Sequence, residues 1–169
     1  MVTTKRWLIH TFIPPWRWRL AFSASALKAI ERAVKHSETQ HRGELQFAIE
    51  NALPPARVWR KQSARQRGAE VFSHLRVWDT EENCGILVYI LLADREVQII
   101  ADRGIAKRVM QSEWDTVAES MQLAFGQGEF LRGSLDGIEQ LTRILAAHFP
   151  PGEDAKANEL DDKPVIIHH

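Results

Sequence analysis

The stretch from Gly85 to Leu92, with the sequence GILVYILL, decides the fold of this chain. Apart from the hydroxyl of Tyr89 it offers no polar side chain, so a strand formed here has no face that favours water. Such a strand must be covered on both sides, which predicts a central position in a sheet with helices above and below it. The stretch is too short to cross a bilayer as a helix, which takes about 20 residues.

Two further segments have the pattern of strands. The segment 44–50 (ELQFAIE) alternates polar and apolar residues, and the segment 96–101 follows Gly85–Leu92 after the short connection Asp94–Arg95. The short connection predicts a hairpin, so the third strand runs antiparallel to the second. A helical segment separates the first two strands, which predicts a right-handed crossover and parallel pairing.

Four segments have the apolar periodicity of helices. They cover 24–40 after the N-cap residue Ser23, 56–75 after a proline pair, 113–126 after the capping signal Ser112-x-x-Asp115, and a last helix that follows Gly133–Ser134 and closes at Phe149–Pro150. The predicted fold class is therefore α/β. We expect a three-layer α/β/α sandwich whose small mixed sheet combines a parallel strand pair with an antiparallel hairpin.

The length of 169 residues suits one domain with tails. We expect an arm rich in Trp and Arg over 1–21, the domain over 22–150 and a flexible tail over 151–169. The arm places Trp7, Trp16 and Trp18 among basic residues. It either anchors the protein weakly at a membrane surface or folds over the domain, and the second interpretation is favoured because Pro14–Pro15 prevents one long amphipathic helix.

Composition excludes several classes of protein. Lys and Arg together number 22 and so do Asp and Glu, and the resulting net charge of zero argues against specific nucleic-acid binding through bulk positive charge. The single cysteine, Cys84, can form neither an internal disulfide nor a site with several thiolates. The N-terminal segment has no apolar stretch of signal-peptide length, so a cytoplasmic location is expected.

Polar side chains are predicted to meet at one edge of the sheet. The first strand begins at Glu44, the second begins after the loop 79–84 (DTEENC), and the third, being antiparallel, finishes just before Asp102. If the first two strands are parallel, these three places share an edge. Carboxylate and carbonyl oxygens are the ligands of calcium and magnesium. We therefore predict a calcium or magnesium site with Glu44, Asp79, Glu82 and Asp102 as ligands.

The alternative is that these acids are solvated loop residues, some of them paired with Arg76, Arg95 or Arg103. A cluster of carboxylates without a cation repels itself and raises its own pKa values, which favours a bound cation if the groups meet. No linear calcium loop with alternating acids occurs, so the prediction depends on the topology of the strands.

The segment 76–87 (RVWDTEENCGIL), followed by 91–95 (LLADR) and 101–105 (ADRGI), resembles the TPM-domain family, in particular its short bacterial members without a membrane anchor. The likeness covers about 22–150 and departs from the family pattern at Cys84, where an asparagine is expected before Gly85. It implies an α/β/α sandwich and, as in some members, calcium or magnesium binding. By similarity, Glu44, the loop 79–85 and Asp102 match recurrent polar positions of the family.

Three functions follow from these observations. The first is a divalent-cation-binding module that acts in interaction or maintenance with a protein partner and without turnover. The second is a metal-assisted, acid phosphatase-like hydrolase, an activity that the resemblance links to a plant thylakoid relative. The third is a peripheral membrane docking unit that uses the arm. The sequence leaves open whether the chain is an enzyme.

Overall fold

The computed structural model describes residues 4–152 and 158–169. Its helices and strands are, in chain order, α1 (Thr4–Phe12), α2 (Trp18–Ala21), α3 (Ala24–Glu38), β1 (Glu44–Glu50), α4 (Pro55–Trp59), α5 (Ala64–His74), β2 (Gly85–Leu91), β3 (Glu96–Ala101), α6 (Arg103–Ala106), α7 (Gln111–Gly126), α8 (Phe130–His148) and β4 (Val165–Ile167).

The strands form one mixed sheet in the order β3-β2-β1-β4. β1 and β2 are parallel over their whole length, with Glu44 opposite Gly85 and Glu50 opposite Leu91. β2 and β3 form the expected antiparallel hairpin. The predicted central position of β2 is confirmed, because all its residues are buried.

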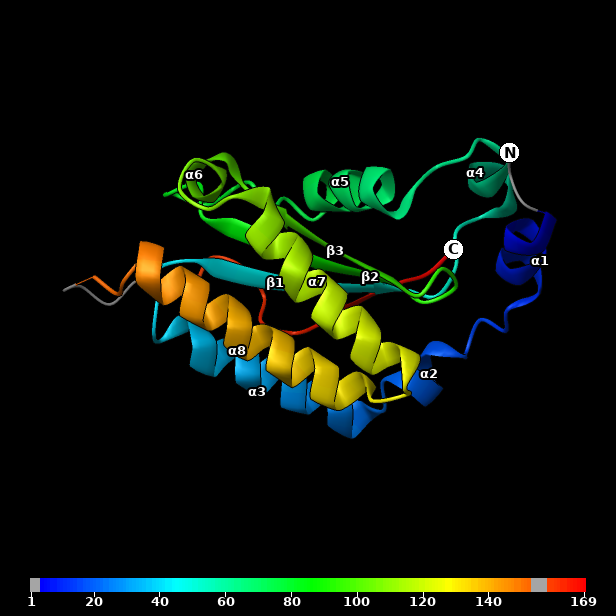
Figure 1. Cartoon of the computed structure of the whole chain (residues 1–169), viewed down its shortest axis with the longest axis horizontal. Coiled ribbons are helices and arrows are strands. Elements are labelled where there is room, and N and C mark those ends of the chain that lie inside the picture. Colours follow the sequence, from blue (N-terminus) through cyan, green and yellow to red (C-terminus); the bar gives the residue numbers. More distant parts are fainter. Residues whose placement is uncertain (1–3, 153–157) are drawn as a thin grey trace.

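Helices cover both faces of this sheet, so the predicted α/β/α layering is confirmed. Figure 1 shows α5 on one side of the sheet and α3, α7 and α8 on the other. Alternate residues of β1 and β2 supply two separate apolar clusters. One, with Phe47 and Val88, packs under α3, α7 and α8. The other, with Ala48 and Leu87, packs under α5.

The helix boundaries differ from the sequence prediction in several places. α7 begins at Gln111 with Met110 as its N-cap residue, so the expected capping residue Ser112 lies inside the helix. The single helix expected over 56–75 is divided into α4 and α5, because Lys61 adopts a left-handed backbone conformation with φ 59°. Ser63 then starts α5 with a capping box closed by Gln66. α8 begins at Phe130 rather than after Gly133–Ser134. Gly133 lies inside it at the contact with α7, where a Cβ atom would come within 2.7 Å of the Cβ of Ala124.

The expectation of a flexible tail over 151–169 is wrong for its last part. Val165–Ile167 forms β4, which pairs in parallel with Ala48–Glu50 of β1. Before that strand, the side chain of Gln46 donates a hydrogen bond to the carbonyl of Lys163 (3.2 Å). The tail therefore adds a strand to the sheet, beside the end of β1. Part of the predicted tail, 153–157, lies outside the described residues.

The N-terminal arm lies against the domain. Figure 1 places α1 next to α4. Arg6 contacts both carboxylate oxygens of Asp94, with Nη2 2.7 Å from Oδ2. His10 is buried, with Nε2 2.9 Å from Asp94 Oδ1, and its Nδ1 accepts a hydrogen bond from the amide of Leu53. No helix in the described part of the chain has both the length and the apolar character needed to cross a bilayer.

The contacts of Asp94 make the docking of the arm dependent on pH. Burial alone would raise the pKa of Asp94, but the hydrogen bonds from His10 and Arg6 outweigh burial and lower the pKa from 3.8 to about 2. Because the pKa is lower in the folded state, the ionised carboxylate stabilises the fold at pH values above about 4. That stabilisation is lost as the pH falls toward about 2.

We predict that Asp94→Asn lowers the free energy of unfolding by about 2–3 kcal/mol at neutral pH, because it leaves the guanidinium of Arg6 without its counter-ion and weakens the acceptor that faces His10 Nε2. Urea unfolding at several pH values measures this effect, and the difference from the unsubstituted protein should shrink below about pH 4. Asp115→Asn, at an exposed position on α7, is the matched control. Equal losses in the two variants would contradict the proposed role of Asp94.

Candidate functional site

The edge where β1 and β2 begin and β3 ends is the candidate site, and its topology is as predicted. Glu44 at the start of β1 lies opposite Gly85 at the start of β2. The amide of Asp102, directly after β3, donates to the carbonyl of Gly85 (2.9 Å), and the amide of Glu44 donates to that of Cys84 (3.0 Å). Glu44, Gly85 and Asp102 therefore stand side by side on three neighbouring segments.

Gly85 and the backbone above it separate the two acidic residues. Residues in register point to the same face of a sheet, so the side chains of Glu44 and Asp102 leave the sheet on the side of α5. Their Cα atoms are two strand spacings apart, about 10 Å. A Cβ atom on Gly85 would come within 1.9 Å of the carbonyl oxygen of Val77, so the backbone of Val77 fills the space between Glu44 and Asp102.

Asp102 has the most unusual environment of the predicted ligands. It is only 8% exposed. Its Oδ1 accepts a hydrogen bond from the amide of Arg103 (2.7 Å) at the start of α6. Its Oδ2 is buried and has no hydrogen-bond partner. A buried carboxylate oxygen without a partner costs free energy that a bound cation would remove.

The loop between α5 and β2 brings further oxygen atoms to the turn that follows Asp102. Asn83 has a left-handed backbone conformation with φ 53°. A Cβ atom on Gly104 would lie 2.4 Å from the carbonyl oxygen of Asn83 and 2.8 Å from that of Glu82, which places both carbonyls against the turn after Asp102. Arg103 Nε donates to Asn83 Oδ1 (2.9 Å) and ties this turn to the loop.

The other two predicted ligands lie on the same loop but in more open positions. Asp79 is exposed, and Glu82 forms an ion pair with Arg42. Cys84 is fully buried, and its thiol donates to the carbonyl of Arg42 (3.1 Å). Within residues 4–152 and 158–169, no group of three or more His, Cys, Asp or Glu side chains is arranged to hold a metal ion. A site built on Asp102 must therefore use backbone carbonyls, as calcium sites do.

Glu44 belongs to a second acidic group on the far side of Val77. Glu38, at the end of α3, accepts a hydrogen bond from the amide of Leu45 (2.9 Å). Burial raises the pKa of Glu38 from 4.5 to about 8. The hydrogen bond from Leu45 opposes this shift, and the charges of Glu44 and Asp162 reinforce it. The tail reaches the same place, since the amide of Leu160 lies 3.4 Å from Glu44 Oε2.

The opposite end of β1 carries a buried polar group that the sequence analysis missed. Glu50 is fully buried and accepts hydrogen bonds from Tyr89 and from Arg67 Nε (3.0 Å), and His169 contacts it as well. The pKa of Tyr89 is raised, mainly by burial and to a lesser extent by the negative charge of Glu50. The polar residues of the segment 44–50 (ELQFAIE), of which Glu50 is the last, could have indicated a buried acid at this end of the strand. The partners of Glu50 come from other elements, so the pattern of the strand alone could not identify them.

The chain is similar to known proteins over most of its length. A family model described as the TPM domain matches residues 20–144. The NMR structure of the BA42 protein from the psychrophilic bacterium Bizionia argentinensis is 30% identical and has a TM-score of 0.75, covering 86% of this chain and 94% of that one. The N-terminal domain of a P. gingivalis protein is 13% identical in sequence and has a TM-score of 0.63. The match covers 83% of this chain and 95% of that domain, and it shows the fold alone. No curated protein matches.

We predict that the free energy of unfolding decreases as the pH rises from about 5 to about 8, because Glu38 stays protonated in the folded state over this range and ionises in the unfolded state. The decrease contributed by this residue is at most about 1.4 kcal/mol per pH unit. Glu38→Gln keeps an oxygen that can accept from Leu45 but cannot ionise, so the variant should lack this contribution.

Chemical unfolding at a series of pH values measures the effect of Glu38→Gln. Glu31→Gln, on the same helix, is the matched control and should retain the decrease. An unchanged pH dependence in Glu38→Gln would contradict the assignment of the raised pKa to this carboxyl.

Proposed function

This chain belongs to the TPM domain family, and on that premise we propose that it is a calcium- or magnesium-binding module whose cation is held by Asp102. The observation that supports this proposal is the buried Oδ2 of Asp102, which has no hydrogen-bond partner. A divalent cation would neutralise this carboxylate and satisfy the oxygen that the protein leaves unpaired. The family supplies the fold, and the proposed cation comes from the chemistry of this edge.

The remaining ligands in the proposal come from the loop before β2. The carbonyls of Glu82 and Asn83 already lie against the turn that follows Asp102. The carboxylates of Asp79 and Glu82 would complete the oxygen ligands from the solvent side, and Glu82 would exchange its ion pair with Arg42 for the cation. Glu44 acts through its charge and not as a ligand, because the backbone of Val77 stands between it and Asp102.

Cation binding without turnover is preferred to hydrolysis of phosphomonoesters at this edge. A hydrolase needs a bound cation and, in addition, a group that gives a proton to the leaving oxygen. Arg103, which Asn83 holds beside Asp102, can stabilise negative charge on a phosphate. It cannot act as the proton donor, because a guanidinium stays protonated in proteins.

We predict that added calcium shifts the amide resonances of Gly85 and Gly104, and that these shifts level off once the site is filled. Asp102→Asn should weaken calcium binding at least about tenfold, because it removes the negative charge that holds the cation. The asparagine retains the shape of the side chain and can still cap α6. An NMR titration with calcium and then magnesium measures both effects.

Two further variants make this titration decisive. Asp136→Asn, at an exposed position on α8, should leave the affinity unchanged. Glu44→Gln should weaken binding less than Asp102→Asn does. Shifts that rise linearly without saturating, or that persist unchanged in Asp102→Asn, would refute the proposed site. Hydrolysis of a phosphomonoester that requires the cation and Asp102 would instead favour the hydrolase.

A second proposal concerns the arm, whose exposed apolar side chains support weak contact with an anionic membrane surface. Five of the exposed large apolar residues of the described chain lie on the arm, and they are Leu8, Ile9, Phe12, Trp16 and Leu20. Basic residues are interleaved with them along the sequence. Apolar side chains together with cations are the combination that binds headgroups and the underlying acyl boundary.

We predict that the protein sediments with vesicles that contain anionic lipid and that Trp16→Ala reduces this binding about tenfold, because burying a large apolar side chain contributes about 1.5–3 kcal/mol. Trp78→Ala removes an exposed tryptophan elsewhere and should have no effect. Equal binding by the two variants, or no binding to anionic vesicles at all, would contradict a role for the arm at membranes.

A further inference from the structure

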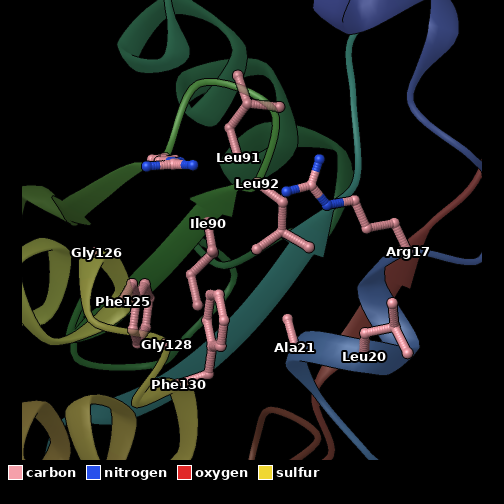
Figure 2. A pocket seen from close by; sticks show the side chains of 11 residues that line it. Arg17, Leu20, Ala21, Ile90, Leu91, Leu92, Phe125, Gly126, Gly128 and Phe130 are labelled. Carbon is pink, nitrogen blue, oxygen red and sulfur yellow. The ribbon is translucent and has the colours of Figure 1, made fainter.

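A cavity of about 340 Å³ lies at the end of β2 opposite to the candidate cation site. It is bounded by α2 of the arm, the last residues of β2, the β2–β3 turn and the turn between α7 and α8. Figure 2 shows the side chains of Ile90, Leu92, Phe130 and Ala21 around this space. The volume falls in the range of cavities that bind small molecules.

The floor of the cavity is apolar and firmly packed. Ile90 is buried in the sheet, and the ring of Phe130 packs against those of Phe22 and Phe125 with centroids 5.6 and 5.2 Å apart. Such a surface does not bind water well and favours an aliphatic or aromatic group.

Two arginines, Arg17 and Arg95, line the same cavity. Figure 2 shows the side chain of Arg17 extending from the arm toward Leu92. Within the described residues, neither guanidinium has an ion pair or a hydrogen bond. Most other arginines of the described chain have such a partner, for example Arg6 with Asp94 and Arg67 with Glu50.

The arm binds one of the two acidic residues that flank Arg95 in the sequence, Asp94 and Glu96. Both oxygens of Asp94 contact Arg6 and His10 of the arm. The arm thus engages Asp94 and adds Arg17 to the cavity. Among the described residues, the lining combines two arginines with apolar side chains and includes no Asp or Glu.

We propose that this cavity binds a free single-chain monocarboxylate, with the carboxylate between Arg17 and Arg95 and the aliphatic chain over Ile90 and Phe130. A volume of about 340 Å³ lies at the small end of the range of ligand cavities, which favours a single medium-length chain over a lipid with two chains. Guanidinium groups bind carboxylates through paired hydrogen bonds.

Octanoate is the probe, titrated at concentrations at which it is monomeric while the methyl resonances of Ile90 and Leu92 are followed by NMR. EDTA is present throughout, so the result does not depend on the proposed cation site. We expect saturable binding with a Kd on the order of 1 mM. Octanol, which lacks the charge, and acetate, which lacks the chain, should each bind at least about tenfold more weakly.

Variants assign the binding to the two arginines. Arg17→Gln and Arg95→Gln should each weaken octanoate binding about tenfold, because each removes a charge-assisted hydrogen bond. Arg19→Gln, which alters a neighbouring arm residue that stacks on Trp18, is the matched control and should bind as the unsubstituted protein does. Ala21→Leu, which places a larger side chain where Figure 2 shows Ala21 facing the cavity, should block binding.

Several results would overturn the proposal. They are equal affinities for octanoate and octanol, equal losses in Arg19→Gln and Arg17→Gln, and binding to anionic vesicles with none to monomeric octanoate. A dimer that Ala21→Leu dissociates would assign the cavity to a second copy of the chain and would overturn it as well. Sedimentation without ligand tests that last possibility, and we expect a monomer.

Discussion

The burial of β2 on both faces is the constraint on which the rest of the structure depends. Its residues alternate between two apolar clusters, one under α3, α7 and α8 and the other under α5. Burying apolar surface stabilises the folded state by about 25 cal/mol for each Å² removed from water. Both faces of this strand are apolar, so both layers of helices are needed to bury them, and the fold requires both layers. Parallel pairing with β1 then fixes which residues meet at each end of the sheet.

That register produces the candidate site and also limits it. Gly85 must lack a side chain because the backbone of Val77 crosses directly above it. The crossing divides the acids of this edge into two groups, one around Asp102 and one that joins Glu44 to Glu38. Topology could bring these residues to one edge, but only the path of the loop decides which of them can reach a common ion.

The sequence was sufficient for features that depend on local pattern, and these include the parallel pair, the hairpin, the three layers and the meeting of the strand starts with Asp102. It was insufficient where tertiary contacts decide. β4 has only three residues and follows a charged, proline-containing segment, so its apolar pattern is too short to stand out. Likewise, the raised pKa of Glu38 depends on its burial and on the nearby charges of Glu44 and Asp162, which no spacing along α3 encodes.

The arm has a larger role than its position at the start of the chain suggests. The family model begins at residue 20, so Arg6, His10 and Arg17 lie outside the matched region, yet all three contribute to one corner of the domain. The arm holds Asp94 through Arg6 and His10 and contributes Arg17 to the positive charge of the cavity. Its docking and the electrostatic character of the cavity are therefore linked, because a change that released the arm would also remove Arg17 from the cavity.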